Sequence, residues 1–212
     1  VMGGNCETAF GNSIKSLCNN DNTIADTVIN NDSVIDNFES QIEQEVVDLI
    51  ALRQPMAIDL RETVTALKIS SDLERIGDLA KNISKRTKLI NNNLPDNLTQ
   101  SIDRVGAMVQ KQLKLVLDSY TNRSPEIALD VWEKDEEVDN LTNLCMEEVI
   151  KYIKSGNENI DHGSHLLFVT KNIERIGDHV TNIAEQIYFL VKGTYLEGER
   201  PKGSDPILNG EK

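Results

Sequence analysis

The pentapeptide Glu-Arg-Ile-Gly-Asp, here called the ERIGD motif, occurs twice in this chain, at residues 74–78 and 174–178. The match extends around it, since residues 67–86 (LKISSDLERIGDLAKNISKR) align with residues 167–186 (LFVTKNIERIGDHVTNIAEQ). A segment ahead of each copy also matches, with acidic residues in the same places. One pentapeptide can recur by chance, but two matched segments in the same order predict an internal duplication.

The apolar residues around each motif recur at the three- and four-residue spacing of a buried helix face, as in Ile69, Leu73, Ile76, Ala80 and Ile83. No alternating strand pattern competes with it. Aromatic residues make up only 4% of the chain and prolines number only five, which favours helices over sheets. The sequence predicts an all-α fold of six long helices, over about residues 9–17, 21–52, 56–90, 98–120, 125–154 and 160–192.

The duplication divides these helices into two sets of three. Because three amphipathic helices can close one core, we expect two pseudo-symmetric three-helix bundles. The first unit is placed at residues 1–93 and the second at residues 94–193. Residues 194–212 are rich in Gly, Pro and charge, have little to bury, and are expected to form a mobile tail.

The charge balance excludes some partners. The formal net charge is −13, which argues against nucleic-acid phosphate and favours cations or a basic protein surface. The three cysteines are widely separated and lack CxxC spacing, as is usual for free thiols in a reducing compartment. With no run of eighteen apolar residues and no signal-peptide pattern, we expect a cytoplasmic protein.

The duplicated segments carry pairs of acidic residues four positions apart, which places both carboxylates on one helix face. There are two pairs in each unit: Asp32 with Asp36 and Glu74 with Asp78, then Asp135 with Asp139 and Glu174 with Asp178. At 100° per residue, Glu74 and Asp78 each lie about 160° from Ile76, so we expect them on an outer face opposite the core stripe. If the second and third helices pack side by side, each unit presents four carboxylates, an arrangement that attracts divalent cations.

A solvated acidic face is the simpler interpretation of any one pair, with Arg75 pairing to Asp72 or Asp78. Four pairs in a repeated frame shift the balance toward cation binding. Gly77 lies within a helical pattern where glycine costs about 1 kcal/mol, which indicates either close helix packing or room beside the acids. His179 follows the second motif, and we interpret it as an ordinary surface histidine.

These segments resemble the PhoU family, the accessory and regulatory proteins of bacterial phosphate-specific transport. The resemblance rests on ALRQPMAIDLRETVTALKISSDLERIGDLAKNI (residues 51–83) and LLFVTKNIERIGDHVTNIAE (residues 166–185), and it spans nearly the whole chain. It implies two pseudo-symmetric three-helix bundles, often paired as a homodimer. It also implies that the acidic motifs hold multinuclear clusters, of iron or zinc in the first place, with manganese or magnesium as alternatives. The implied ligands are Asp32, Asp36, Glu74 and Asp78 in the first cluster, and Asp135, Asp139, Glu174 and Asp178 in the second.

The family represses the phosphate-starvation response through contacts with the ATPase subunit of the phosphate ABC transporter and with a membrane sensor histidine kinase. The resemblance therefore implies a non-enzymatic regulator of phosphate homeostasis that reaches the membrane only through its partners. Two alternatives stay open. One is a helical scaffold without metal, and the other is a carboxylate-bridged di-metal enzyme. The enzyme is disfavoured because such oxidases use inward Glu-x-x-His pairs, which neither motif contains.

Overall fold

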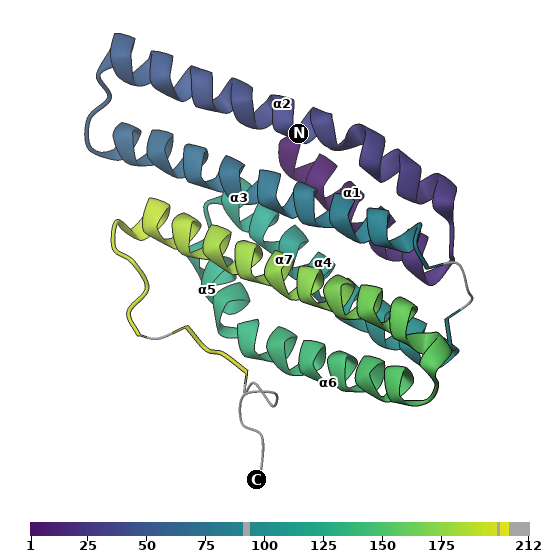
Figure 1. Ribbon diagram of the computed structural model, residues 1–212. Helices are drawn as coiled ribbons and strands as arrows, with labels where there is room; N and C mark the ends of the chain where they lie inside the picture. Colours follow the sequence, from purple (N-terminus) through teal and green to yellow (C-terminus); the bar gives the residue numbers. More distant parts are fainter. Residues whose placement is uncertain (91–93, 199, 204–212) are drawn as a thin grey trace.

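The computed structural model describes residues 1–90, 94–198 and 200–203. Figure 1 shows its helices, which are α1 (Met2–Cys18), α2 (Asn22–Arg53), α3 (Ile58–Thr87), α4 (Asp96–Asn122), α5 (Pro125–Glu133), α6 (Asp135–Lys154) and α7 (Ile160–Lys192). A short 3₁₀ turn, η1 (Asn157–Asn159), precedes α7. These described residues contain no strand, which confirms the prediction of an all-α fold. None of their helices is both long and apolar enough to cross a membrane.

Local sequence signals account for the ends of α2. The Asp21 side chain accepts hydrogen bonds from the backbone N–H groups of Thr23 and Ile24, satisfying donors that the first turn leaves free. At the other end, Gln54 takes the left-handed conformation with φ of 46°. It directly precedes Pro55, and proline disfavours helical geometry in the residue before it. The predicted break between the second and third helices is confirmed.

The predicted fifth helix is two helices, because the chain bends at Lys134. Ser124 caps α5 and Pro125 takes its first position, as predicted. The Lys134 carbonyl accepts a hydrogen bond of 3.3 Å from the Gln112 side chain of α4. A new helix, α6, then begins on three acidic residues at positions 135–137, which the positive end of the helix dipole stabilises. The bend places Asp135 at the start of α6.

The two motif helices lie at the centre of the molecule. Figure 1 shows α2, α3, α7 and α6 side by side in one layer, with α1, α4 and α5 behind it. In this layer α3 packs against α7, while α2 covers the outer side of α3 and α6 covers the outer side of α7. The duplication is therefore visible as two related halves that meet along α3 and α7.

The apolar stripes of both motif helices are buried in a common core. Every residue of the predicted stripe of α3 is at most 5% exposed, and the stripe of α7 is fully buried. Residues of both halves form one hydrophobic cluster. The unit boundary between residues 93 and 94 stays a prediction, because residues 91–93 lie outside the described part. The same holds for residues 204–212 of the tail.

Polar side chains also join α3 to α7. His179 Nδ1 lies 2.8 Å from Asp72 Oδ1, and Asn182 donates to the same oxygen over 3.5 Å. Arg86 of α3 stacks over the Phe168 ring, with its guanidinium carbon 4.0 Å from the ring centroid. The interpretation of His179 as an ordinary surface histidine is wrong, since its half-buried ring lies between the two motif helices. Asp72 accordingly pairs with His179 rather than with a neighbour on its own helix.

Candidate functional site

The first acidic cluster, defined as Asp32, Asp36, Glu74 and Asp78, lies where α2 packs against α3. Lys81, one turn beyond the motif, holds it together: its ammonium pairs with Asp32 and lies 3.5 Å from Asp78 Oδ1. Arg75 adds a second cation on the outer side, 3.3 Å from Glu74 Oε2 and 3.5 Å from Asp78 Oδ2. The pairing of Arg75 with Asp78 agrees with the prediction.

The acids of this cluster are less exposed than a helical wheel of α3 predicts. The side chain of Asp32 is 5% exposed, that of Glu74 14% and that of Asp78 37%. The expected outer face is thus wrong for Glu74, because α2 covers the side of α3 opposite the core. Glu74 Oε2 is buried and has no hydrogen-bond partner.

Gly77 allows this close approach of the two helices. A Cβ atom at position 77 would lie 2.9 Å from Cδ1 of Ile35 on α2, and one at Gly177 would lie 3.2 Å from Cγ1 of Val138 on α6. Of the two explanations that the sequence leaves open, helix packing is the one that the geometry supports. Both copies of the ERIGD motif therefore have glycine at this position, although glycine within a helix costs about 1 kcal/mol of stability relative to alanine.

The second acidic cluster, defined as Asp135, Asp139, Glu174 and Asp178, lies between the start of α6 and the middle of α7. Asp135 is its most buried member, with a side chain only 1% exposed. Its oxygen Oδ1 accepts a hydrogen bond of 2.9 Å from the Thr181 hydroxyl. Glu174 turns toward Lys171, whose ammonium lies 2.7 Å away.

A segment that follows α7 completes the second cluster. Arg200 donates from Nε to Asp135 Oδ2 over 2.6 Å, and from Nη2 to Asp135 Oδ1 and Asp178 Oδ1 over 2.8 Å each. The backbone N–H of Gly203 donates to Asp139 Oδ2 over 3.0 Å. Sequence reasoning missed both Lys81 and Arg200. Lys81 could have been found from its i+3 spacing to Asp78, whereas nothing in the sequence of the tail singles out Arg200.

Burial, together with the crowding of carboxylates, raises several pKa values in the two clusters. Burial raises the pKa of Glu74, and the charge of Asp78 raises it further. Burial and the charge of Asp32 raise the pKa of Asp36. Burial likewise raises the pKa of Asp139, although the Gly203 N–H opposes this shift. These carboxylates are ionised at a cost, which a nearby cation reduces.

We expect Glu74→Gln to stabilise the fold at pH 7 by about 0.2–0.5 kcal/mol, the size of a like-charge i,i+4 repulsion. Because folding raises the pKa of Glu74, its unfavourable contribution is absent below the unfolded value of about 4.3 and grows as the pH rises through the folded value. Urea unfolding at pH 7 and pH 4 measures this. The gain should vanish at pH 4, and the control Glu174→Gln, which loses its pair with Lys171, should show none.

As the side chains stand, no group of three or more His, Cys, Asp or Glu residues in the described ranges is arranged to hold a metal ion. The donors nevertheless have the right chemistry, because carboxylate oxygen suits hard and borderline divalent ions. Lys81 and Arg200 occupy the positions between the carboxylates of the two helices. A metal ion bound by all four acids of either cluster therefore requires that cation to move.

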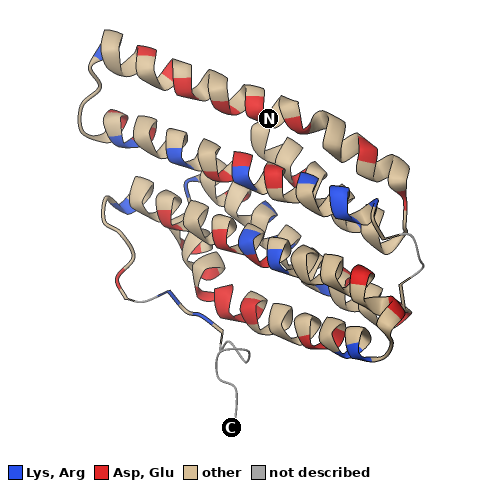
Figure 2. Cartoon of the chain, in the orientation of Figure 1, with Lys and Arg blue, Asp and Glu red and all other residues tan. Residues whose placement is uncertain are grey.

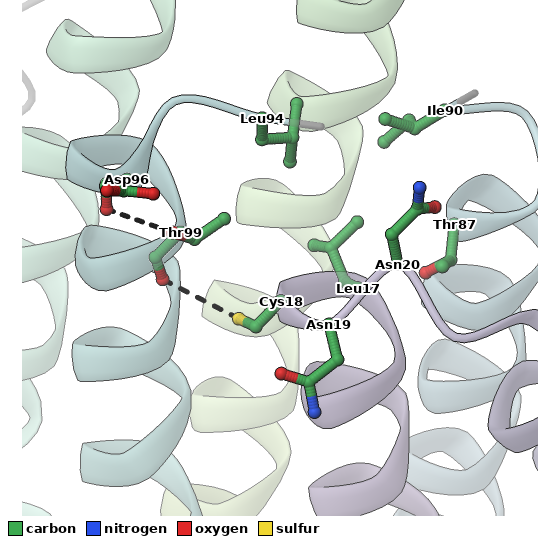
Figure 3. Close-up of a pocket in the computed structure, with 9 residues that line it drawn as sticks. All are labelled: Leu17, Cys18, Asn19, Asn20, Thr87, Ile90, Leu94, Asp96 and Thr99. Atoms are coloured by element: carbon green, nitrogen blue, oxygen red, sulfur yellow. Dashed lines mark hydrogen bonds between the residues drawn. The ribbon is translucent and has the colours of Figure 1, made fainter. Parts of the chain in front are cut away.

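Two hollows in the described part of the chain lie away from the acidic clusters. The pocket in Figure 3, of about 200 Å³, lies where the ends of α1 and α3 meet the start of α4. Its thiol, Cys18, lies 3.6 Å from the Thr99 carbonyl oxygen, and burial raises the pKa of Cys18 to about 11. That thiol is a poor nucleophile because it stays protonated at neutral pH.

A groove of about 710 Å³ between α1, α2, α3 and α4 has a mostly apolar lining, with carboxylates from Glu45 and Glu62.

Comparison with known proteins gives consistent matches. The PhoU domain family model matches residues 1–87 and 102–187. A phosphate-specific transport system accessory protein PhoU homologue from Caulobacter vibrioides is 47% identical over 202 residues, which cover 95% of this chain and 88% of that protein. A homologue of the same description from Rhizobium meliloti is 44% identical, with 95% and 85% covered. The crystal structure of PhoU from Pseudomonas aeruginosa superimposes with a TM-score of 0.87 at 31% identity, covering 91% of this chain and 93% of that one.

Proposed function

This chain belongs to the PhoU family, and we propose that it regulates phosphate uptake and the phosphate-starvation response by contacting other proteins. The observation that carries the proposal is the similarity to phosphate-specific transport system accessory proteins along 95% of the chain. An accessory role in phosphate transport follows from that similarity. The proposed part is that the chain acts by contacting other proteins, that it represses the phosphate-starvation response, and that it does so without catalysis.

The proposed partners are the ATPase subunit of the phosphate ABC transporter and the phosphate sensor histidine kinase. The charge of the outer helix supports a basic partner surface, since α2 carries seven acidic residues and one basic residue. Figure 2 shows these acids along its length. We further propose a cytoplasmic homodimer that meets the membrane only through these partners and binds no nucleic acid.

We also propose that the acidic clusters bind metal ions, with iron or zinc first and manganese or magnesium as alternatives. The ligands would be Asp32, Asp36, Glu74 and Asp78 in the first cluster, and Asp135, Asp139, Glu174 and Asp178 in the second. The buried Glu74 Oε2, which accepts no hydrogen bond, and the raised pKa values of Glu74, Asp36 and Asp139 support a cation at these positions. A bound ion would hold α2 to α3 and α6 to α7 by its charge.

A helical scaffold without metal is the second candidate. The observation that favours it is the presence of Lys81 and Arg200 among the carboxylates, where they supply positive charge without an ion. The two candidates differ in what happens when either cation is removed. With a metal function, ions should then bind more tightly; for a scaffold alone, removal should only destabilise the fold.

Deleting the gene in its host should make phosphate-starvation genes, such as those of an alkaline phosphatase, constitutively expressed in phosphate-rich medium. The expected loss of repression is complete, because the proposed signal passes through contacts that only this chain supplies. Reporter expression at high and low phosphate measures it, with the chain returned on a plasmid as the control. Normal repression in the deletion strain would contradict the regulatory assignment.

Co-purification tests the proposed contact itself. The tagged chain should bring down the transporter ATPase from the host, and the interaction should need no catalytic residue of this chain. Repression without such an association would move the site of action to another partner.

A further inference from the structure

Residues 200–203, here called the C-terminal segment, lie across the second acidic cluster. Figure 2 shows basic residues that follow α7 beside the acidic start of α6. Arg200 donates from its guanidinium to Asp135 and Asp178, and the backbone N–H of Gly203 donates to Asp139. Three of the four proposed ligands of this cluster are therefore engaged by the C-terminal segment.

The contact is closely fitted. The side chain of Arg200 is only 17% exposed, and its guanidinium binds both oxygens of Asp135, a geometry that its planar set of donors favours. Although burial alone would lower its pKa, the hydrogen bonds to Asp135 and the nearby charges of Asp178 and Asp139 raise it. A Cβ atom at Gly203 would lie 2.6 Å from Cβ of Asp139, so the backbone passes where only glycine fits.

Tyr195, which lies between α7 and this segment, is also held by contacts. The Tyr195 ring stacks on the Phe189 ring with centroids 4.3 Å apart and planes 6° apart. The ammonium of Lys68 on α3 lies 6.0 Å from the centroid of the Tyr195 ring. The residues after α7 thus turn back along the molecule, which brings the C-terminal segment within reach of α6.

Comparison of the two repeats shows what the C-terminal segment replaces. Lys81 bridges Asp32 and Asp78 in the first cluster, and it is part of the motif helix α3. The matching position in the second repeat, one hundred residues later, is Thr181, whose neutral hydroxyl donates to Asp135. The missing positive charge comes instead from Arg200. One cluster has a cation built into its helix, and the other receives it from a segment that follows the last helix.

We propose that the second acidic cluster is a binding site for an arginine-bearing chain segment, occupied by residues 200–203 of the same chain as a displaceable cation. Because the segment is not part of any of the described helices, it can leave without disturbing one of them. The consequence for metal rests on the proposed function: an ion at Asp135 and Asp178 must displace Arg200. The two clusters then differ, since opening the first requires a residue of α3 to move.

The amide of residue 203 reports on the segment without any metal. Its hydrogen exchange, followed by NMR in the full chain, should be slowed by the bond to Asp139. Arg200→Gln should speed this exchange by about tenfold or more, the effect of losing charge-assisted hydrogen bonds. Gly203→Val, which keeps Arg200 but collides with Asp139, should do the same. Lys202→Gln removes an equal charge from an exposed neighbour and should have no effect.

Equal exchange in wild type and in both Arg200→Gln and Gly203→Val would overturn the proposal, provided that circular dichroism shows all of them folded. Zinc binding by equilibrium dialysis then tests the competition. It should tighten by about tenfold in Arg200→Gln and return to the wild-type value when Asp135→Asn and Asp178→Asn are added. If neither protein binds zinc while the exchange difference persists, the metal function fails and the arginine site stands.

Discussion

Replacing Ile76 or Ile176 with alanine should lower the free energy of unfolding by about 2–5 kcal/mol, and both changes should shift one common transition. Each isoleucine is fully buried at the centre of its motif helix, so alanine leaves a cavity that the surrounding helices fill only in part. The single transition follows from the shared core, because α3 packs against α7 and both belong to one hydrophobic cluster.

The position of Trp132 makes this test specific. It is the single tryptophan of the chain and lies on α5 in the second half, where its indole N–H donates to Glu185 over 2.9 Å. Its fluorescence should report the destabilisation caused by Ile76→Ala in the first half, at the same midpoint as the far-ultraviolet circular dichroism. Leu144→Ala, at a side chain that is 58% exposed on α6, is the control and should change stability by about 0.5 kcal/mol or less. If Ile76→Ala left the midpoint of the transition seen by tryptophan fluorescence unchanged, the two halves would unfold separately.

Much of the fold could be predicted because its determinants are local or repeated. The stripe around Ile76 follows from helical spacing, and every one of its predicted members is buried. Asp21 and Ser124 cap their helices through hydrogen bonds to residues only a few positions away, and Pro125 takes the first position of α5. The duplication indicated which helices correspond, but it did not predict that the halves would share a core along α3 and α7. The division at Lys134 was missed since it involves Gln112, a residue of another helix.

The candidate site was predicted in composition but not in environment. A helical wheel places Glu74 opposite Ile76, yet it describes one helix alone and cannot show that α2 covers that face. For the same reason the burial of Asp32 and Asp135 was not expected, although the acids gather by pairs of helices as their spacing indicated. Arg200 reaches Asp135 across sixty-five residues, and the sequence carries no periodic signal for such a contact.

Lys81, the cation of the first cluster, should contribute more to stability than its partly exposed position suggests. Lys81→Met keeps the length of the side chain but leaves Asp32 buried without its ion pair. Breaking a fully buried pair costs about 3–5 kcal/mol. Because Lys81 is itself 26% exposed and water can reach the vacated position, we expect the lower value of about 2–3 kcal/mol.

Lys88 offers a matched control, since it also links α3 to α2 through an ion pair, with Asp26, but both partners are exposed. Lys88→Met should therefore cost about 1 kcal/mol or less. In an Asp32→Asn background, Lys81→Met should lose most of its effect, since no buried charge is then left unpaired. An equal cost for Lys81→Met with and without Asp32→Asn would show that the pair is not what stabilises the packing of α2 against α3.

Zinc or manganese should restore the stability of Lys81→Met, because the position that the ammonium leaves lies between Asp32 and Asp78. An ion that binds only the folded chain stabilises it by about 2.7 kcal/mol at a hundredfold excess over its dissociation constant, close to the expected loss. Thermal unfolding with chelator and with each ion measures the recovery. Adding Asp78→Asn should reduce it, since one ligand from α3 is then neutral. If no ion raises the midpoint of Lys81→Met above that of the Asp78→Asn double variant, the carboxylates of the first cluster are partners for Lys81 and not ligands for a metal.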